Sequence, residues 1–256
     1  MPRLARVKSI TKIYHIMLRG IDKRDIFIED EDRFKFLDNI NNAKKIGNFE
    51  LYGYCLMDNH VHILIKENEE IGISIKRITV GYVGWHNKKY ERVGHLFQNR
   101  FLSEPVTTEK YLLTVLRYIH QNPVKANMVQ RAQDYAWSSF NDYYLYYNNQ
   151  NTLINGDLIK FYLNTFEEFN KFMDTDNNDE CLENKTIAHI NDKNLKELIS
   201  LEYNVSDLIE LPVNEKCKLI KDIYRKKSSS IRQLSRVFGL GKTLVEKAIK
   251  NEVENK

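Results

Sequence analysis

The sequence predicts an α+β domain followed by an all-helical module. Two observations favour this class. In the first part of the chain, short apolar runs bounded by turn residues alternate with segments whose apolar residues recur every three or four positions. Near the C-terminus, only this helical spacing continues. The 256-residue chain is longer than a typical domain of roughly 100 to 150 residues, so one core with a smaller appended part is expected. Its 42% hydrophobic and 29% charged residues are typical of a globular protein.

The first predicted elements are a strand and a helix. The apolar run Tyr14–Leu18 ends at Arg19 and Gly20, as a strand leading into a loop does. Asp30 is a candidate N-cap for a helix that Gly47 ends. One apolar face of this helix is predicted to contain Phe34, Leu37, Ile40 and Ala43.

A hairpin and a second helix follow. The segments Glu50–Met57 and His60–Lys66 are predicted to pair, because Asp58 and Asn59 tolerate positive φ and suit a tight turn. Steps of four, three, four and three residues then mark an amphipathic helix. Its apolar positions are Ile71, Ile75, Ile78, Tyr82 and Trp85.

The domain is completed by a strand, Phe97–Val106, and a helix that starts near Thr108 and that Pro123 is expected to end. The helix aligns Tyr111, Val115, Tyr118 and Asn122 on one face. The resulting order is βαββαβ and then a helix. That order is the ferredoxin-like pattern, an antiparallel sheet with helices packed on one face.

Three parts are therefore expected: a domain at 1–147, a linker or extension at 148–194 that becomes rich in Asp, Asn and Glu, and a helical module at 195–256. The end of the module has the pattern helix, short turn, helix, with predicted boundaries at 231–238, 239–241 and 242–250. This pattern resembles a DNA-binding helix-turn-helix, and helix packing with a solvated basic face is the alternative.

Charge is concentrated near the C-terminus. The chain carries a net charge of +4 and has a pI near 8.7, which is only mildly basic. Residues 216–250, however, hold eleven basic and two acidic side chains. This excess predicts binding to a polyanion such as DNA.

Cysteine usage and hydropathy favour a cytoplasmic protein. Cys55, Cys181 and Cys217 are odd in number and form no CxxC pair, so the sequence indicates neither a disulfide framework nor a thiolate zinc site. The basic N-terminus lacks the apolar stretch of a signal peptide, and no run has the length of a membrane span.

Two histidines are candidate metal ligands. Residues two apart on a strand face the same side, so His60 and His62 are expected to present their imidazoles together while Val61 and Ile63 face the core. Imidazole is a common ligand of divalent cations. The alternative is a pair of hydrogen-bonded surface histidines.

A tyrosine and an amide form the second candidate group. Tyr118 and Asn122 are four apart on one helix face, so both side chains can reach one point above the sheet. The alternative is a packed tyrosine, since the chain holds fifteen tyrosines, and an asparagine that ends the helix before Pro123.

Five sequence blocks resemble the REP-associated tyrosine transposases, in the same order. These blocks are YHIMLRG at 14–20, YCLMDNHVHILI at 54–65, HLFQNRF at 95–101, RYIHQNPVKANMV at 117–129 and WSS at 137–139. They extend over nearly all of the first 145 residues. An HUH motif combined with a tyrosine-bearing NPV block is highly specific. Relatives of compact size end near residue 150, so the resemblance does not explain the C-terminal region.

The resemblance implies a metal-dependent single-stranded DNA endonuclease and strand transferase. In such an enzyme His60 and His62 would hold Mg²⁺ or Mn²⁺ against the scissile phosphate, with Asn122 as third ligand or Gln121 in its place. Tyr118 would be the nucleophile, leaving a 5′-phosphotyrosine bond and a free 3′-OH. A phenol has a pKa of about 10, so a nearby cation or base is needed to favour the phenolate.

Further residues are candidates for contacts with DNA phosphates. In the domain these are His15, Arg19, Arg100 and Lys125, and in the C-terminal module Lys242, Thr243 and Lys247. Solvated charge or local pairing is the alternative for each. His95 and His120 are interpreted as structural.

The implied partner is single-stranded DNA with hairpin-forming repeats, with duplex contact by the C-terminal module and no membrane. The protein would be a monomer or a homodimer. Two other functions remain open: a non-catalytic DNA-binding regulator on the same fold, and a zinc-dependent hydrolase. A regulator gives no physical reason for keeping both histidines and the tyrosine, and a zinc-dependent hydrolase leaves Tyr118 unexplained.

Overall fold

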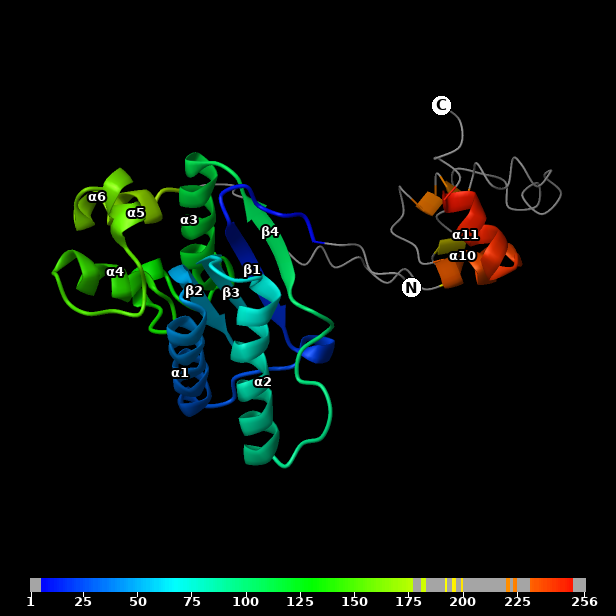
Figure 1. Cartoon of the computed structure of the whole chain (residues 1–256), viewed down its shortest axis with the longest axis horizontal. Helices are drawn as coiled ribbons and strands as arrows, with labels where there is room; N and C mark the ends of the chain where they lie inside the picture. The colour runs from blue at the N-terminus through cyan, green and yellow to red at the C-terminus, as the bar shows by residue number, and fades with distance from the viewer. Residues whose placement is uncertain are drawn as a thin grey trace. The chain divides into compact units, whose positions relative to one another are not determined.

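The computed structural model contains two compact units, Met1–Glu183 and Asn184–Lys256, which are described separately (Figure 1). The structure describes residues 6–176, 181, 182, 192, 195, 196, 199, 220, 221, 223, 224 and 231–250. Most of residues 177–230 therefore lie outside the described residues. This range holds the end of the predicted linker (148–194) and the beginning of the predicted helical module (195–256).

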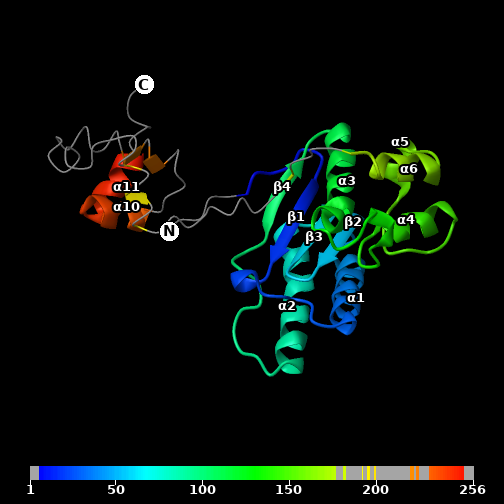
Figure 2. The ribbon, with the colours of Figure 1, turned by 180° about the vertical axis from the view of Figure 1, so that it is seen from behind.

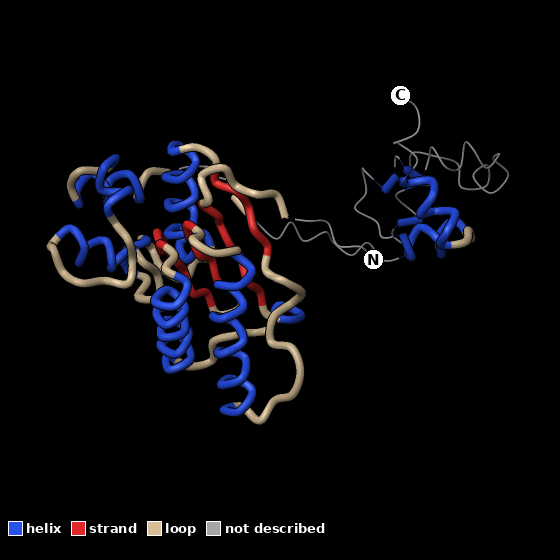
Figure 3. Tube along the Cα trace, in the orientation of Figure 1, coloured by secondary structure: helices blue, strands red, loops and turns tan. Residues whose placement is uncertain are grey.

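The first unit is built on a four-stranded antiparallel sheet (Figure 3). Its strands are β1 (Ile13–Arg19), β2 (Glu50–Met57), β3 (His60–Lys66) and β4 (Leu102–Val106). They lie in the order β2-β3-β1-β4, so β3 and β1 are central. The predicted antiparallel sheet and the predicted hairpin of β2 and β3 are confirmed.

Three long helices cover both faces of this sheet: α1 (Asp30–Gly47), α2 (Ile71–Lys89) and α3 (Glu109–Lys125) (Figures 1 and 2). Leu18 of β1 and Ile75 of α2 line one cavity, whereas Tyr118 of α3 touches His62, whose side chain points to the other side of the sheet. The prediction of helices on one face thus holds for α1 and α2, and is wrong for α3. An amphipathic helix can cover either face, so its own sequence pattern does not decide between them.

The start of α1 differs from the prediction. Its N-cap is Glu29 and not Asp30, because the Asp32 carboxylate accepts hydrogen bonds from the backbone N–H groups of Ile28 and Glu29, at 2.7 and 2.9 Å. The buried face holds Phe36, Ile40 and Ala43, whereas Phe34 is 64% exposed.

Three local predictions are corrected. The strand β4 begins at Leu102 and not at Phe97, because the residues before it leave the sheet after an isolated bridge between Gly20 and Phe97. Helix α3 continues past Pro123 to Lys125, since a proline in the last turn removes only one hydrogen bond. The hairpin turn is tight, but neither of its two residues, 58 and 59, has a positive φ.

Shorter elements complete the first unit. They are η1 (Ile21–Lys23), η2 (Ala132–Asp134), α4 (Phe140–Tyr147), α5 (Asp157–Tyr162) and α6 (Phe166–Met173). Ile159 of α5 and Phe169 of α6 are fully buried in the same core as the sheet. Residues 148–173, predicted as the beginning of a linker, are therefore folded against the first domain.

In the second unit, α10 (Ile231–Phe238) and α11 (Lys242–Lys250) are joined by a short turn in which Gly239 has a φ of +63°. Leu234, Val245 and Ala248 form part of a small apolar core. The predicted succession of helix, turn and helix over 231–250 is confirmed. No helix among the described residues combines the length and apolarity that crossing a bilayer requires.

Candidate active site

The candidate site lies on the α3 side of the sheet and starts from β3. His60 and His62 point to this side, while Val61 and Ile63, with no exposed surface, point into the core under α1 and α2. His62 is 1% exposed and His60 is partly buried. The two rings meet edge to face, with centroids 5.1 Å apart.

The turn before His60 is held by three segments of the chain. The Asp58 carbonyl accepts hydrogen bonds from the N–H groups of Ile26 and Phe27, at 2.7 and 3.1 Å. The Asn59 carbonyl accepts one from the N–H of Gly20, at 2.8 Å. The Asp58 carboxylate also forms an ion pair with Arg33. These contacts fix the point at which the two histidines enter the sheet.

A third histidine joins the pair. His15 of β1 is fully buried, and its Nε2 lies 2.9 Å from Nδ1 of His62. The sequence indicated His15 only as a candidate phosphate contact. Its burial and its bond to His62 make it a partner of the motif instead. The signal that identifies it is its place on β1, opposite β3, which requires the strand pairing to be known.

Helix α3 places Tyr118 against this cluster. The Tyr118 ring meets the rings of His15 and His62 edge to face, at centroid distances of 5.8 and 5.7 Å. The helix approaches closely because β2 has a glycine below it: a Cβ at Gly53 would lie 2.6 Å from Leu116 Cδ1. Tyr118 is 3% exposed, and the ammonium group of Lys125 lies 5.1 Å from the centre of its ring.

The two candidates for a third metal ligand differ in their surroundings. The Asn122 side-chain amide donates to the Tyr118 carbonyl at 2.8 Å, which keeps it on the turn after the tyrosine. The Gln121 amide donates to the carbonyls of Met173 and Thr175, at the end of α6. Among the described residues, no hydrogen bond joins either amide to His60 or His62.

Burial keeps the histidines neutral. It lowers the pKa of His60 to about 4, with a smaller contribution from the Arg19 guanidinium. Burial, followed by the neighbouring His15 and His60, holds the pKa of His62 well below its usual range. Arg19 also has a buried Nε without a hydrogen-bond partner in the described part of the chain. The site thus combines neutral imidazoles with a cation able to bind an anion.

The donor atoms fit a divalent cation. His60 uses Nδ1 in a 2.7 Å hydrogen bond to the Asn59 side-chain oxygen, and His62 uses Nδ1 toward His15. Nε2 of each ring therefore remains for a metal, the arrangement in which the other ring nitrogen of a ligand is held by a second group. Among the described residues, no group of three His, Cys, Asp or Glu side chains is placed to hold a metal, so the remaining ligands would be an amide, water or phosphate oxygens.

Comparison with known proteins agrees with this geometry. The family model described as "Transposase IS200 like" matches residues 8–122, a range that contains both histidines and the tyrosine. Residues 8–122, which are less than half of the chain, are therefore similar to the IS200-like transposase family. We refer to residues 8–122 below as the transposase-family domain.

Two individual proteins are similar to this chain. A Haemophilus influenzae protein provisionally named a REP-associated tyrosine transposase is 29% identical over 105 residues, which cover 36% of this chain and 59% of the relative. The chain thus spans about three fifths of the curated relative that it matches. A solved structure of a REP-associated tyrosine transposase bound to a REP hairpin aligns with a TM-score of 0.48 and 18% identity, over 56% of this chain and 84% of that one.

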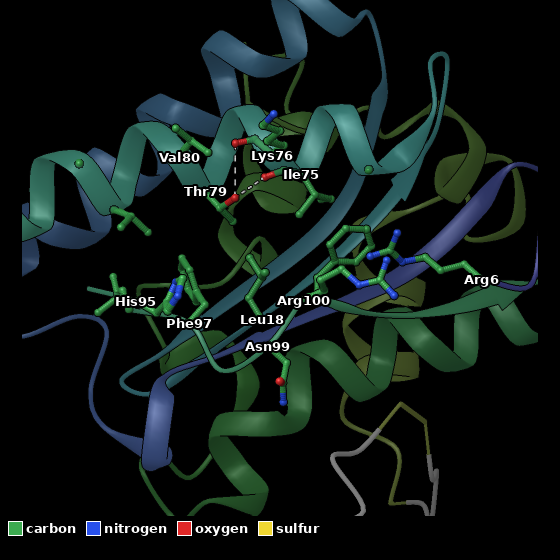
Figure 4. Close-up of a pocket in the computed structure, with 15 residues that line it drawn as sticks. Arg6, Leu18, Ile75, Lys76, Thr79, Val80, His95, Phe97, Asn99 and Arg100 are labelled. Atoms are coloured by element: carbon green, nitrogen blue, oxygen red, sulfur yellow. Dashed lines mark hydrogen bonds between the residues drawn. The ribbon is translucent and has the colours of Figure 1, made fainter. Parts of the chain in front are cut away.

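Two residues singled out in the sequence, the candidate phosphate contact Arg100 and the histidine His95, lie apart from Tyr118. Arg100 lines a cavity of about 660 Å³ between α2 and the segment before β4, on the sheet face opposite Tyr118 (Figure 4). The Arg6 guanidinium lies 3.7 Å from the centre of the Phe101 ring in this cavity. His95 is exposed and lines the same cavity.

His120 is structural, as predicted. It is fully buried next to α4, and its Nε2 lies 2.8 Å from Ser139 Oγ. Burial lowers the pKa of His120 to about 3.

Outside the transposase-family domain, Lys242, Thr243 and Lys247 are exposed on α11. Lys242 forms a 3.4 Å ion pair with Glu246 one turn later. Val245 and Ala248, on the other side of the helix, are buried. The basic face of α11 is thus open to a partner.

Proposed function

We propose that the protein is a metal-dependent transposase that nicks and rejoins single-stranded DNA through Tyr118. The observation that carries this proposal is the contact of Tyr118 with His62 and His15 on one sheet face. A DNA-binding regulator has no need of a tyrosine packed against paired imidazoles. The strand order β2-β3-β1-β4, combined with the βαββαβ succession, supports a ferredoxin-like fold for the domain.

In the proposed reaction the Tyr118 oxygen attacks the phosphorus of a DNA strand. A bond forms between the phenolic oxygen and phosphorus, and the bond from phosphorus to the 3′-oxygen breaks. The phenol loses its proton and the 3′-oxygen gains one, so the products are a 5′-phosphotyrosine bond and a free 3′-OH. Attack by another 3′-OH reverses the step and joins the strands.

The residues around Tyr118 have defined roles in this reaction. His60, His62 and, as third ligand, Asn122 would hold Mg²⁺ or Mn²⁺, which supplies charge neutralisation at the phosphate oxygens. The Lys125 ammonium group, 5.1 Å from the centre of the Tyr118 ring, would contact a DNA phosphate beside the tyrosine. Arg19, whose buried Nε has no hydrogen-bond partner among the described residues, is the candidate for binding a phosphate oxygen. Since Tyr118 is 3% exposed, binding of DNA must uncover its hydroxyl before attack.

Two further features support a DNA substrate. The cavity on the opposite face brings the Arg6 and Arg100 guanidinium groups together beside Phe97 and Phe101, and this combination of cations and rings suits an unpaired nucleotide (Figure 4). In the second unit, Lys242, Thr243 and Lys247 form a surface suited to the phosphates of a duplex.

We further propose that hairpin-forming repeats are the substrate and that one chain is sufficient for catalysis. Tyr118 contacts the histidines of its own chain, which supports catalysis by a single chain. A homodimer that exchanges tyrosines is the alternative.

The test is covalent capture of DNA. The full chain is incubated with labelled single-stranded hairpin oligonucleotides and Mn²⁺, and protein-DNA adducts are separated on a denaturing gel. We expect an adduct that is lost in Tyr118→Phe and on addition of a chelator. Tyr144→Phe, which alters a half-exposed tyrosine on α4, is the matched control and should retain the adduct.

Two outcomes would contradict the proposal. An adduct that persists in Tyr118→Phe would assign the nucleophile to another residue. Binding of the oligonucleotides without any adduct, over a broad pool of sequences, would favour the regulator.

A further inference from the structure

Three side chains on the α3 side of the sheet form a continuous polar row that runs from β4 to β3. Glu104 of β4 lies opposite His15 of β1, and its Oε2 is 3.8 Å from His15 Nδ1. The other nitrogen of His15, Nε2, is 2.9 Å from Nδ1 of His62. His15 thus lies between a carboxylate and a metal-ligand candidate.

The carboxylate at one end decides where the hydrogens lie. A neutral imidazole carries one N–H and one lone pair, and an ionised carboxylate only accepts hydrogen bonds. The negative charge of Glu104, 3.8 Å away, therefore favours the hydrogen of His15 on Nδ1, which is buried and has no hydrogen-bond partner among the described residues. Nε2 of His15 is then an acceptor, so the hydrogen of His62 must be on its Nδ1. The lone pair of His62 is left on Nε2.

We propose that Glu104 and His15 are positioning residues that hold His62 in its Nδ1–H form, with the Nε2 lone pair directed at the metal position. This inference rests on the proposed function, since it assigns a purpose to the row only if His62 is a metal ligand. It extends the site to two strands that lie outside the HUH motif.

The reversed arrangement is disfavoured at both ends of the row. If His15 donated from Nε2, its Nδ1 lone pair would face the Glu104 carboxylate, and His62 Nε2 would carry a hydrogen instead of a lone pair. The Glu104 side chain is also fixed from the chain beyond α6, because the N–H of Leu182 donates to its Oε2 at 3.0 Å.

The first experiment measures the hydrogen position directly. Long-range ¹⁵N–¹H NMR spectra of the metal-free full chain at neutral pH report which ring nitrogen of each histidine carries the hydrogen. We expect Nδ1–H for His62 in the wild type. His15→Leu removes the acceptor and should shift the population toward Nε2–H, whereas His15→Gln, whose side-chain oxygen can accept from Nδ1–H, should restore it.

Glu104→Gln is the second variant. An amide can donate or accept, so it no longer sets the direction of the row, and we expect a mixture of the two forms at His62. The Glu104 side chain is 32% exposed, so this variant should fold even where His15→Leu does not. His86→Leu, which removes another fully buried histidine on α2, is the matched control and should leave His62 unchanged.

The second readout is the affinity for Mn²⁺, measured by calorimetry without DNA. Loss of a group that orients a metal ligand typically weakens binding about 10- to 100-fold. We expect a loss of this order in His15→Leu, a smaller loss in Glu104→Gln and an affinity near that of the wild type in His15→Gln.

The outcomes separate this inference from the proposed function. A wild-type His62 with the hydrogen on Nε2, or one whose Nδ1–H form survives in both His15→Leu and Glu104→Gln, would overturn the role of the row. Failure of adduct formation in a protein that shows the expected NMR and Mn²⁺ results would instead argue against the transposase reaction alone.

Discussion

Both faces of the sheet bury side chains of the central strands, but the two faces are built from different chemistry. Under α1 and α2, the strands bury Ile16, Val61 and Ile63 without exposed surface. Under α3, the same strands bury His15 and His62 almost as completely. Aliphatic burial stabilises a fold, whereas a buried polar group costs free energy unless it is paired. The face under α3 is therefore the one whose residues require a functional explanation.

The strongest test of this comparison removes one residue from each face. His62→Gln should reduce the rate of adduct formation at least about a hundredfold, since a catalytic metal contributes several kcal/mol to the transition state and each 1.36 kcal/mol is tenfold. The variant should retain most of its stability. Adduct formation is measured on gels and unfolding by urea titration. A wild-type rate in His62→Gln would remove the functional distinction between the faces.

The neighbouring residue on the other face should behave in the opposite way. Ile63→Ala leaves a cavity under α1 and α2, which typically costs about 2 to 5 kcal/mol of unfolding free energy. The folded fraction should form adducts at nearly the wild-type rate, because Ile63 points away from Tyr118. Urea titration together with adduct assays at low temperature would show whether the two faces are independent.

The pH dependence of stability tests another buried histidine of α3, His120. The pKa of His120 is about 3 in the folded protein because of burial, and about 6.5 in an unfolded chain. The unfolded state therefore binds the proton first as the pH falls, and stability is lost below about pH 6.5. His120 should contribute a loss of up to about 2 kcal/mol between pH 7 and pH 5.

The measurement is the unfolding free energy at both pH values. In His120→Gln the fall between pH 7 and pH 5 should be smaller by that amount, whereas the exposed His95→Gln should behave as the wild type. An unchanged pH dependence in His120→Gln would mean that His120 takes up its proton without unfolding.

The smallest effect is expected in the second unit. Lys247→Gln on α11 should weaken binding of duplex DNA modestly and reduce the slope of log affinity against log salt by about 1. Glu246, one position earlier, offers a control of the opposite sign, since Glu246→Gln should not reduce the slope. Fluorescence anisotropy over a range of salt concentrations is sufficient. An identical slope in Lys247→Gln would exclude this face from phosphate contact.

Sequence reasoning predicted the elements of the first domain well, because strands and amphipathic helices leave periodic signals. Sequence reasoning was wrong where contacts between residues distant in the sequence determine which side chains are buried and which face of the sheet a helix covers. Phe34 continues the apolar spacing of α1 but is exposed, since Phe36 occupies the core beside Tyr82. The side of the sheet that α3 covers depends on the close approach at Gly53, and no local pattern encodes that approach.

The candidate site divides in the same way. His60 and His62 are two apart on one strand, and Tyr118 belongs to a specific block, so all three were predicted from the sequence. The sequence predicts a phosphate contact for His15 and gives no signal for Glu104. Both lie on strands remote in sequence from the HUH motif, and their roles follow only from the register of β1 with its neighbours.

The turn at Asp58 and Asn59 carries an evolutionary consequence. Its length is constrained because three segments hold it and the sheet register starts at His60. Its side chains are constrained as well, since Asp58 pairs with Arg33 and the Asn59 oxygen lies 2.7 Å from His60 Nδ1. An insertion of one residue here that shifted the register would turn His60 and His62 into the apolar core and bring Val61 to the surface under α3. In descendants of this protein, insertions and deletions at this turn should therefore be eliminated by selection.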